Sequence, residues 1–357
     1  MSSEAKFQFV NKLLTWHEKN DRYLPWKTNK DPYQIWLSEI ILQQTRVAQG
    51  LPYFERFIHQ FPTVFELANA AEAEVFKTWE GLGYYSRARN LHHTAKEIVK
   101  TFDGHFPDTY DGLLRLKGIG PYTAAAIASF AFDLPHAVLD GNVFRVLSRI
   151  FGINLPIDQV VGKQHFQKLA ESLLTAGDAA KFNQAIMDFG ALQCVPQNPN
   201  CSECPMHHIC VAYQTGRVKD LPFKSKRIVK QNRYFHFFEV KDDNSFWIEK
   251  RNGKDIWQGL YQFPHIESIE PLIEKDSALW PGIDREDLRP VFSSKQQLTH
   301  RTIHGAFYQI EVSGLTNIPE NWIKIEHTRL SEYPFPRIIH DYLKSREWLL
   351  LFKSAVD

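Results

Sequence analysis

The chain of 357 residues is long enough for two domains, and its 43% hydrophobic and 23% charged content is typical of a globular protein. A formal net charge of +1 excludes an overall basic field, so any nucleic-acid binding must depend on local patches and backbone amides. The sequence shows no charged-then-apolar N-terminal segment and no long uncharged apolar run, which argues against a signal peptide and a membrane span. We therefore expect a cytoplasmic protein.

The first strong helical signal is Asp31-Pro32, a capping residue followed by proline at the first helical position. It predicts a helix over Tyr33–Thr45. Within this helix Glu39 stands among large apolar residues, where burial would raise its pKa as a general acid requires. The alternative, that Glu39 lies on a solvated face or pairs with an arginine, is equally compatible with this segment.

Residues 81–90 form a loop rich in glycine, aromatic and basic residues that leads into a helix. Aromatic side chains beside arginines can stack on bases and hold phosphates. Tyr84 and Tyr85 are also explained by core packing, which this segment taken alone favours.

A glycine-rich turn at Gly118 and Gly120 precedes Tyr122 and an Ala-rich segment that extends to Phe132. Glycines relieve the steric limit on such a turn, and unpaired N–H groups at the following helix start can bind a phosphate. This is the pattern of a helix-hairpin-helix, at about 113–132. Asp140 follows it, where it is expected to cap a helix over Val143–Phe151, a role compatible with a catalytic one.

All four cysteines lie in one window with the spacing Cys-x6-Cys-x2-Cys-x5-Cys: Cys194, Cys201, Cys204 and Cys210. In a reducing compartment, clustered thiols indicate metal ligands and not disulfides. Four thiolates suit structural zinc or an iron–sulfur cluster equally well.

A basic run from Arg217 to Arg233 marks the expected domain boundary, either as a solvated linker or as a strap along a duplex. Residues before it are mainly helical in pattern. After it, short alternating or aromatic runs predict strands of a mixed α/β domain. These strands are expected at 234–240, 245–251, 259–265 and 307–315.

The whole chain resembles the MutY-type adenine DNA glycosylases of the endonuclease III-like superfamily. The cysteine spacing matches their single 4Fe-4S loop, residues 81–88 are close to a MutY signature, and 257–264 resembles the Nudix-like C-terminal domain. No Glu-rich Nudix box is present, so nucleotide hydrolysis is not expected. The resemblance implies a mainly α glycosylase domain over 1–225 with the 4Fe-4S loop at 194–210. An α+β Nudix-like domain over 226–357 would recognise the opposite base.

By this resemblance Glu39 protonates a flipped adenine and Asp140 stabilises or bonds the oxocarbenium-like sugar, as in two-carboxylate glycoside hydrolysis. Tyr122 and Asn142 organise this pair. The family's Phe-Ser-His loop corresponds here to Leu298, Thr299 and His300, with Leu replacing the aromatic residue. The remaining implied substrate contacts are Trp26 and Gln184 in the adenine pocket, Gln44 and Tyr84 at the opened base step, and Thr45 and Leu82 at the opposite base.

The expected partner is double-stranded DNA with adenine opposite 8-oxoguanine or guanine, bound by a monomeric, bacterial-type, DNA-associated enzyme. Relatives that also cleave the strand carry a lysine at the position of Tyr122, so base removal alone is expected here. Tyr122 and the long second domain disfavour an endonuclease III-like enzyme for oxidised pyrimidines. A non-catalytic iron–sulfur DNA-binding module would need neither Glu39 nor Asp140.

Overall fold

The computed structural model describes residues 2–174, 179–225, 229–242, 244–268, 289–311 and 318–345. It divides into two compact units. One contains Met1–Asn69 and Asn90–Arg227, and the other contains Ala70–Arg89 and Ile228–Asp357. The chain therefore enters the second unit once, returns, and enters it again after the cysteine loop. No helix among the described residues is long and apolar enough to cross a membrane.

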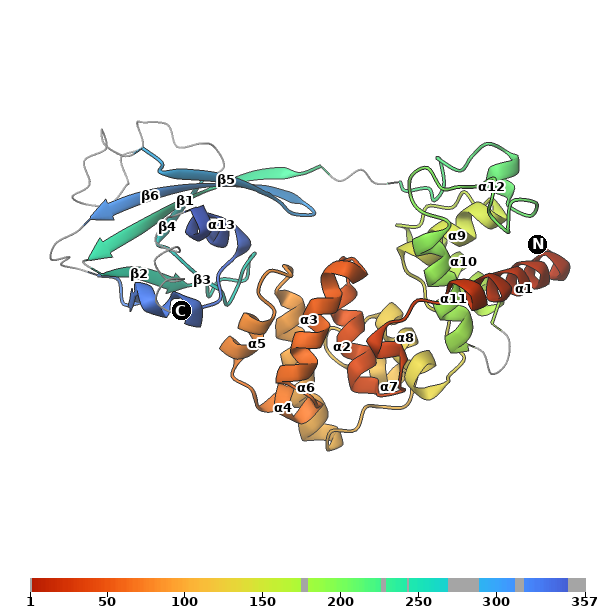
Figure 1. Ribbon diagram of the computed structural model, residues 1–357, viewed down its shortest axis with the longest axis horizontal. Helices are drawn as coiled ribbons and strands as arrows, with labels where there is room; N and C mark the ends of the chain where they lie inside the picture. The colour runs from red at the N-terminus through yellow and green to blue at the C-terminus, as the bar shows by residue number, and fades with distance from the viewer. Residues whose placement is uncertain are drawn as a thin grey trace. The chain divides into compact units, whose positions relative to one another are not determined.

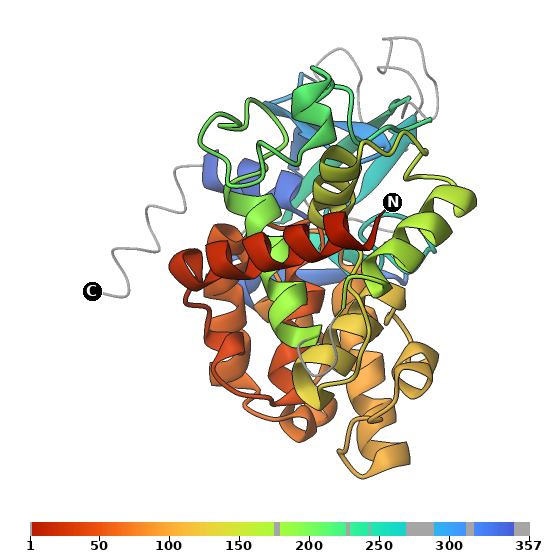
Figure 2. The ribbon, with the colours of Figure 1, turned by 90° about the vertical axis from the view of Figure 1, so that its right-hand side faces the viewer.

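The first unit is built from helices, and one apolar cluster joins residues of α1, α8, α9, α10 and α11. Within it α1 lies across α11, which also packs against α9 (Figures 1 and 2). A second contact, between α2 and α8, brings together the segments that carry Glu39 and Tyr122. The helices before the glycine-rich turn are α1 Ser3–Asn20, η1 Pro25–Lys27, α2 Pro32–Leu42, α3 Val47–Gln60, α4 Val64–Asn69 and α6 Ser86–Phe102. α7 Tyr110–Arg115 precedes the turn directly, and the helices after it are α8 Pro121–Phe132, α9 Gly141–Phe151, α10 Val160–Glu171, α11 Ala179–Leu192 and α12 Val211–Gln214.

Local signals explain where α2 begins, and a residue with a positive φ explains why the helix is shorter than predicted. Asp31 caps the helix by accepting from the Tyr33 N–H at 2.9 Å. The helix ends at Leu42 and Gln44 has a φ of 57°, so the predicted extension to Thr45 is wrong. Gln44 and Thr45 therefore lie in the turn between α2 and α3.

The helix-hairpin-helix is formed by α7 and α8. Gly118 has a φ of +80°, and a Cβ there would lie 2.7 Å from the Asn90 Cβ, so the turn requires glycine. Gly120 is the N-cap of α8, and a Cβ on it would meet nothing within 4 Å. The start of α8 is thus open to a close approach.

The described residues of the second unit form a seven-stranded sheet in the order β3-β2-β1-β6-β5, with β4 pairing to β1 and β7 to β2. β1 and β6 run parallel, and the other pairs are antiparallel. On one face α13 Arg337–Ser345 packs through Tyr342, whose ring stacks on Phe307 at 4.3 Å. The strands are β1 Gln231–Asp242, β2 Ser245–Lys250, β3 Tyr261–Gln262, β4 His265–Ser268, β5 Phe292–Gln297, β6 Arg301–Glu311 and β7 Trp322–Glu326, followed by η3 His327–Glu332.

The predicted strands correspond to this sheet with differences at their ends. The segments 234–240 and 245–251 lie in β1 and β2, except that β2 ends at Lys250. The segment 259–265 is divided between β3 and β4 because Pro264, which has no N–H to donate, interrupts the pairing. Residues 312–315 of the fourth predicted strand lie outside the described residues, as do Lys226 and Arg227 of the basic run.

Residues 70–89, including α5 Glu72–Thr78, belong structurally to the second unit. Glu80 accepts from the His340 Nε2 at 2.6 Å and from the Phe335 N–H at 3.0 Å. Arg89 donates to the carbonyl of Gln258. This grouping of an early segment with the late sheet was not predicted.

Candidate active site and cysteine cluster

Glu39 lies on the inner side of α2 and is only 7% exposed. Burial raises the pKa of its carboxyl from 4.5 to about 7. The hydrogen bond from Tyr122 opposes this shift in pKa, and the nearby charge of Asp140 adds to it. Glu39 therefore holds a proton that it can donate near neutral pH, as a general acid must.

Asp140 is the N-cap of α9, where its carboxylate accepts from the Val143 N–H at 2.8 Å and from the Asn142 Nδ2 at 2.7 Å. Burial raises the pKa of Asp140, while these donors and the charge of Arg145 favour the carboxylate. Glu39 is buried with one hydrogen-bond donor, Tyr122, and lies near the negative charge of Asp140. Asp140 has several donors and the positive charge of Arg145 nearby. Two carboxyls whose environments differ in this way are suited to separate roles as acid and anion.

Tyr122 stands in the first turn of α8 and is hydrogen-bonded to Glu39. Its hydroxyl also lies 3.5 Å from the Sδ of Met187. Burial, together with the charges of Glu39 and Asp140, raises the pKa of Tyr122 well above its ordinary value. The phenol therefore stays protonated and serves as a hydrogen-bond donor.

Arg145 joins this group to the cysteine loop, and sequence reasoning did not find it. It donates to the Asn142 Oδ1 at 2.9 Å, to the Gly190 carbonyl at 2.6 Å and to the Cys194 carbonyl at 2.7 Å. The available signal was the pair Arg145 and Arg149, four residues apart on an otherwise apolar helix. Both are buried.

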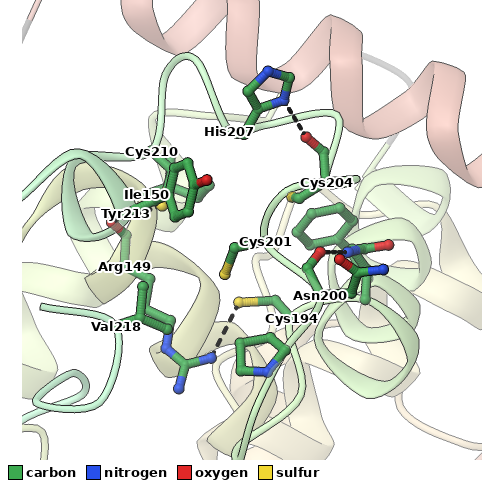
Figure 3. A pocket seen from close by; sticks show the side chains of 13 residues that line it. Arg149, Ile150, Cys194, Asn200, Cys201, Cys204, His207, Cys210, Tyr213 and Val218 are labelled. Atoms are coloured by element: carbon green, nitrogen blue, oxygen red, sulfur yellow. Dashed lines mark hydrogen bonds between the residues drawn. The ribbon is translucent and has the colours of Figure 1, made fainter. Parts of the chain in front are cut away.

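The four cysteines line one cavity, and Figure 3 shows the sulfurs of Cys194 and Cys201 directed into the same gap. Four thiols around one cavity provide the ligand set of a metal centre, either zinc or an iron–sulfur cluster. Among the described residues, a group without cysteine also brings three ligand atoms within 4.8 Å of one another.

The surroundings of the thiols also suit thiolate ligands. Burial raises the pKa of Cys204 to about 12, so its thiolate form requires a positive partner. Arg149 lies beside the loop, with its Nη1 3.5 Å from the Cys194 Sγ. The Met206 N–H is directed at the Cys204 Sγ at 3.4 Å.

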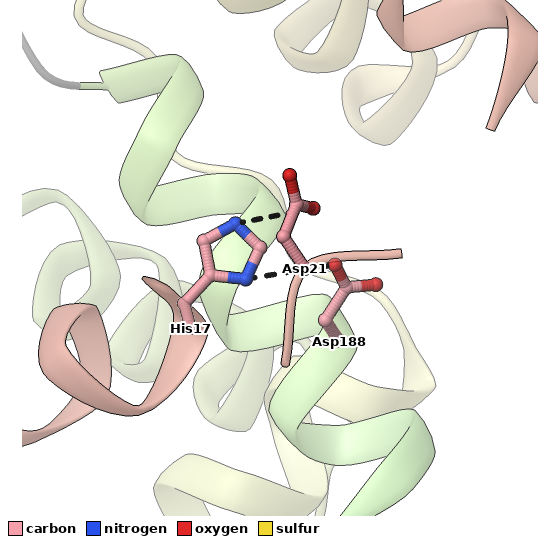
Figure 4. A group of neighbouring side chains, drawn as sticks. All are labelled: His17, Asp21 and Asp188. Atoms are coloured by element: carbon pink, nitrogen blue, oxygen red, sulfur yellow. Dashed lines mark ion pairs between the residues drawn. The ribbon is translucent and has the colours of Figure 1, made fainter. Parts of the chain in front are cut away.

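The group of ligand atoms within 4.8 Å is formed by His17, Asp21 and Asp188 (Figure 4). Asp188 is fully buried, but the Arg22 Nε at 2.8 Å and the Lys27 Nζ at 3.1 Å already bind its carboxylate. Two cations thus balance the two carboxylates, and this cluster is structural. It ties the segment around η1 to α11.

The predicted substrate residues fall into two groups, one in each unit. In the first unit Trp26 is buried, and its ring centroid lies 5.0 Å from that of Phe54. Gln184 is half-buried on α11. Gln44 is exposed and Thr45 is half-buried. These four residues lie on η1, on α11 and in the turn after α2.

In the second unit the structure brings Tyr84 and Thr299 together, with their hydroxyl oxygens 2.5 Å apart. Tyr84 is 44% exposed with a φ of 49°, so it is not a core residue, whereas Tyr85 and Leu82 are buried. The turn between β5 and β6 contains Leu298, Thr299 and His300, of which His300 is exposed.

Three family models match the chain. Residues 37–172 match the HhH-GPD superfamily of base excision DNA repair proteins. Residues 194–210 match the iron–sulfur binding domain of endonuclease III, and 236–345 match a NUDIX domain. The predicted fold class and the predicted 4Fe-4S cluster on the four cysteines are confirmed.

Curated relatives match over most of the chain. An adenine DNA glycosylase of Buchnera aphidicola subsp. Schizaphis graminum is 34% identical over 92% of this chain and 96% of its own length. That of Mus musculus is 41% identical over 60% of this chain and 44% of its own. The predicted resemblance is thereby confirmed.

Solved structures match more than half of the chain. A thermostable thymine-DNA glycosylase has a TM-score of 0.56 at 30% identity and covers 59% of this chain and 98% of its own. An endonuclease III–DNA complex has a TM-score of 0.53 at 20% identity, covers 60% of this chain and 99% of its own, and so shows the fold alone.

Proposed function

Because the chain belongs to the adenine DNA glycosylases, we propose that it excises adenine opposite 8-oxoguanine or guanine from duplex DNA, acting as a monomer. The observation that carries this proposal is the pair of buried carboxyls. Glu39 has a pKa of about 7, and Asp140 is surrounded by hydrogen-bond donors. Cleavage of a glycosidic bond uses such a pair, with one carboxylic acid to protonate the leaving group and one carboxylate at the sugar carbon.

In the proposed reaction, Glu39 donates its proton to a ring nitrogen of the flipped adenine. The bond between the base nitrogen and the sugar then breaks, and adenine leaves as a neutral molecule with the bonding electron pair. Asp140, held by Asn142 and the Val143 N–H, stabilises the positive charge on the sugar until water adds. The adding water passes one proton to the ionised Glu39, which restores the acid. The products are free adenine and an abasic site.

Tyr122 favours base removal without strand cleavage. Strand cleavage by this class of fold uses an amine that attacks the sugar carbon. The phenol at this position is kept protonated by its raised pKa, which makes it a poor nucleophile. Its proposed role is to hold the Glu39 carboxyl in place.

The 4Fe-4S cluster has a proposed structural role. Bound by Cys194, Cys201, Cys204 and Cys210, it supplies the cross-link that orders the loop 194–210. The Cys194 carbonyl accepts from Arg145, which in turn holds Asn142. Order in the loop thus supports the side chain that orients Asp140.

The remaining proposed contacts recognise the duplex. Trp26 and Gln184 would form the adenine pocket, and the open start of α8 at Gly118 and Gly120 would bind a backbone phosphate. Gln44 and Tyr84 would act at the opened base step, and Thr45 and Leu82 at the opposite base. The turn containing Leu298, Thr299 and His300 would distinguish 8-oxoguanine from guanine by base-edge contacts.

The test uses duplexes with adenine opposite 8-oxoguanine, adenine opposite guanine, or an oxidised pyrimidine. Abasic sites are scored with and without alkali, since alkali cleaves strands at abasic sites that the enzyme leaves intact. We expect excision of adenine only, with strand breaks that depend on alkali. Excision of the pyrimidine, or adenine excision undiminished in Glu39→Gln, would contradict the proposal.

A further inference from the structure

In the second unit three arginines converge on one carboxylate. Asp255 lies in the loop after β2, and its Oδ1 accepts from the Arg233 Nη1 and the Arg301 Nη1, each at 2.9 Å. Its Oδ2 accepts from the Arg251 Nη2 at 3.1 Å and from the second Nη of Arg233. One anion thus joins the start of β1, the end of β2 and the start of β6.

Two of the three arginines are fixed independently of Asp255. Arg233 also pairs with Glu267, and Arg251 also donates to the Ile256 carbonyl at 3.1 Å. Both guanidinium groups lie over the Phe235 ring, at 5.2 and 5.4 Å from its centroid. They therefore hold Asp255 in one place, and Asp255 is the anchor to which Arg301 is attached.

Arg301 follows directly after the turn formed by Leu298, Thr299 and His300. The Leu298 N–H donates to the Arg301 carbonyl at 2.8 Å, which closes the turn on the residue whose side chain Asp255 binds. The His300 carbonyl accepts from the Gln231 N–H at 3.1 Å. The base of the turn is thus attached to the sheet through the backbone and through Asp255.

We propose that Asp255 is a positioning residue that, through Arg301, sets the place of Thr299 and thereby the preference for 8-oxoguanine over guanine opposite the adenine. This proposal rests on the proposed function of the turn. Without the carboxylate, three guanidinium groups face one another with no shared anion. Arg301 has the most exposed side chain of the three, at 36%, so we expect it to turn into solvent when the carboxylate is removed.

The experiment compares full-length Asp255→Asn with Asp242→Asn, each carrying its cluster. Asp242 is a matched control because it forms a 2.7 Å ion pair with Lys324 on the same sheet, at the opposite end of β1. Single-turnover rates are measured on adenine opposite 8-oxoguanine and opposite guanine. We expect Asp255→Asn to lower the ratio of the two rates by roughly fivefold, within the range of effects carried by residues remote from a ligand. The control should keep the wild-type ratio.

A second variant, Arg301→Gln, separates positioning from general stability. It should lower the ratio as Asp255→Asn does, and the double variant should lower it no further, because both changes remove one connection. The proposal is overturned if both single variants keep the wild-type ratio, whether their rates are unchanged or fall equally on the two duplexes. A wild-type protein that excises no adenine would instead overturn the proposed function itself.

Discussion

Replacing Glu39 by Gln should stabilise the protein at alkaline pH while it abolishes catalysis. Gln keeps the size of the side chain and an oxygen that can accept from Tyr122, but it never carries a charge. Burial of this carboxyl destabilises the native protein at every pH at which the unfolded chain would ionise it. The size of that cost follows from its pKa.

The pKa of Glu39 rises from 4.5 to about 7 on folding, a difference equivalent to about 3 kcal/mol. Between these two values the folded protein holds a proton that the unfolded chain has released, so stability falls as the pH rises through this window. Below pH 4.5 the wild type carries no such penalty, and above pH 7 it carries all of it. At pH 8 the free energy of unfolding of Glu39→Gln should therefore exceed that of the wild type by about 3 kcal/mol.

The assay is thermal unfolding of both proteins, with the cluster present, at pH 4.5 and pH 8 and one scan rate. For a domain of this size about 3 kcal/mol corresponds to a rise in Tm of roughly 6 to 12 °C. The control is Glu55→Gln on α3, which is exposed and should give the same Tm as the wild type at both pH values. Equal Tm values for Glu39→Gln and wild type at pH 8 would show that Glu39 is solvated, and the argument for it as the acid would fail.

Three further predictions concern the same site. The kcat/KM for adenine release should fall tenfold per pH unit above about pH 7, as Glu39 loses its proton; a flat profile to pH 9 would move the acid elsewhere. Asp140→Asn should lose adenine excision in a single-turnover assay. Its Tm should stay within a few degrees of the wild type, since Asn caps a helix as well as Asp. Retained excision would refute the role of Asp140. Cys204→Ser should lose iron, sulfide and the brown colour, whereas the wild type should contain four iron atoms per chain by metal analysis; stoichiometric zinc in place of iron would contradict the cluster.

Sequence reasoning succeeded where the signal is local. Asp31-Pro32 determines the start of α2, Gly118 determines the turn before α8, and Asp140 caps α9 through the Val143 N–H. Each depends on residues within a few positions of one another. The spacing of the cysteines is equally local, so their common cavity could be expected.

The predictions failed where long-range pairing decides the structure. β5 reads Phe-Ser-Ser-Lys-Gln-Gln, in which Phe292 is the one apolar residue, so no apolar alternation marks the strand and it was missed. Arg145 became part of the site only because Asn142, Gly190 and Cys194 meet around it in three dimensions. The spacing of Arg145 and Arg149 on α9 marks Arg145 as unusual, but no local pattern predicts which residues it contacts.

The attachment of residues 70–89 to the sheet changes what a truncation can test. A fragment ending at Lys226 would remove His340, Phe335 and Gln258, the partners of Glu80 and Arg89, and so would leave α5 and Tyr84 without support. An altered base preference in that fragment could then not be assigned to the missing sheet alone, because α5 and Tyr84 would have lost their support as well. Conversely, a protease nick confined to the linker before β1 should yield two pieces that stay associated, because the first piece still carries a segment bound to the second. Point substitutions in the full chain are therefore the sharper way to dissect recognition.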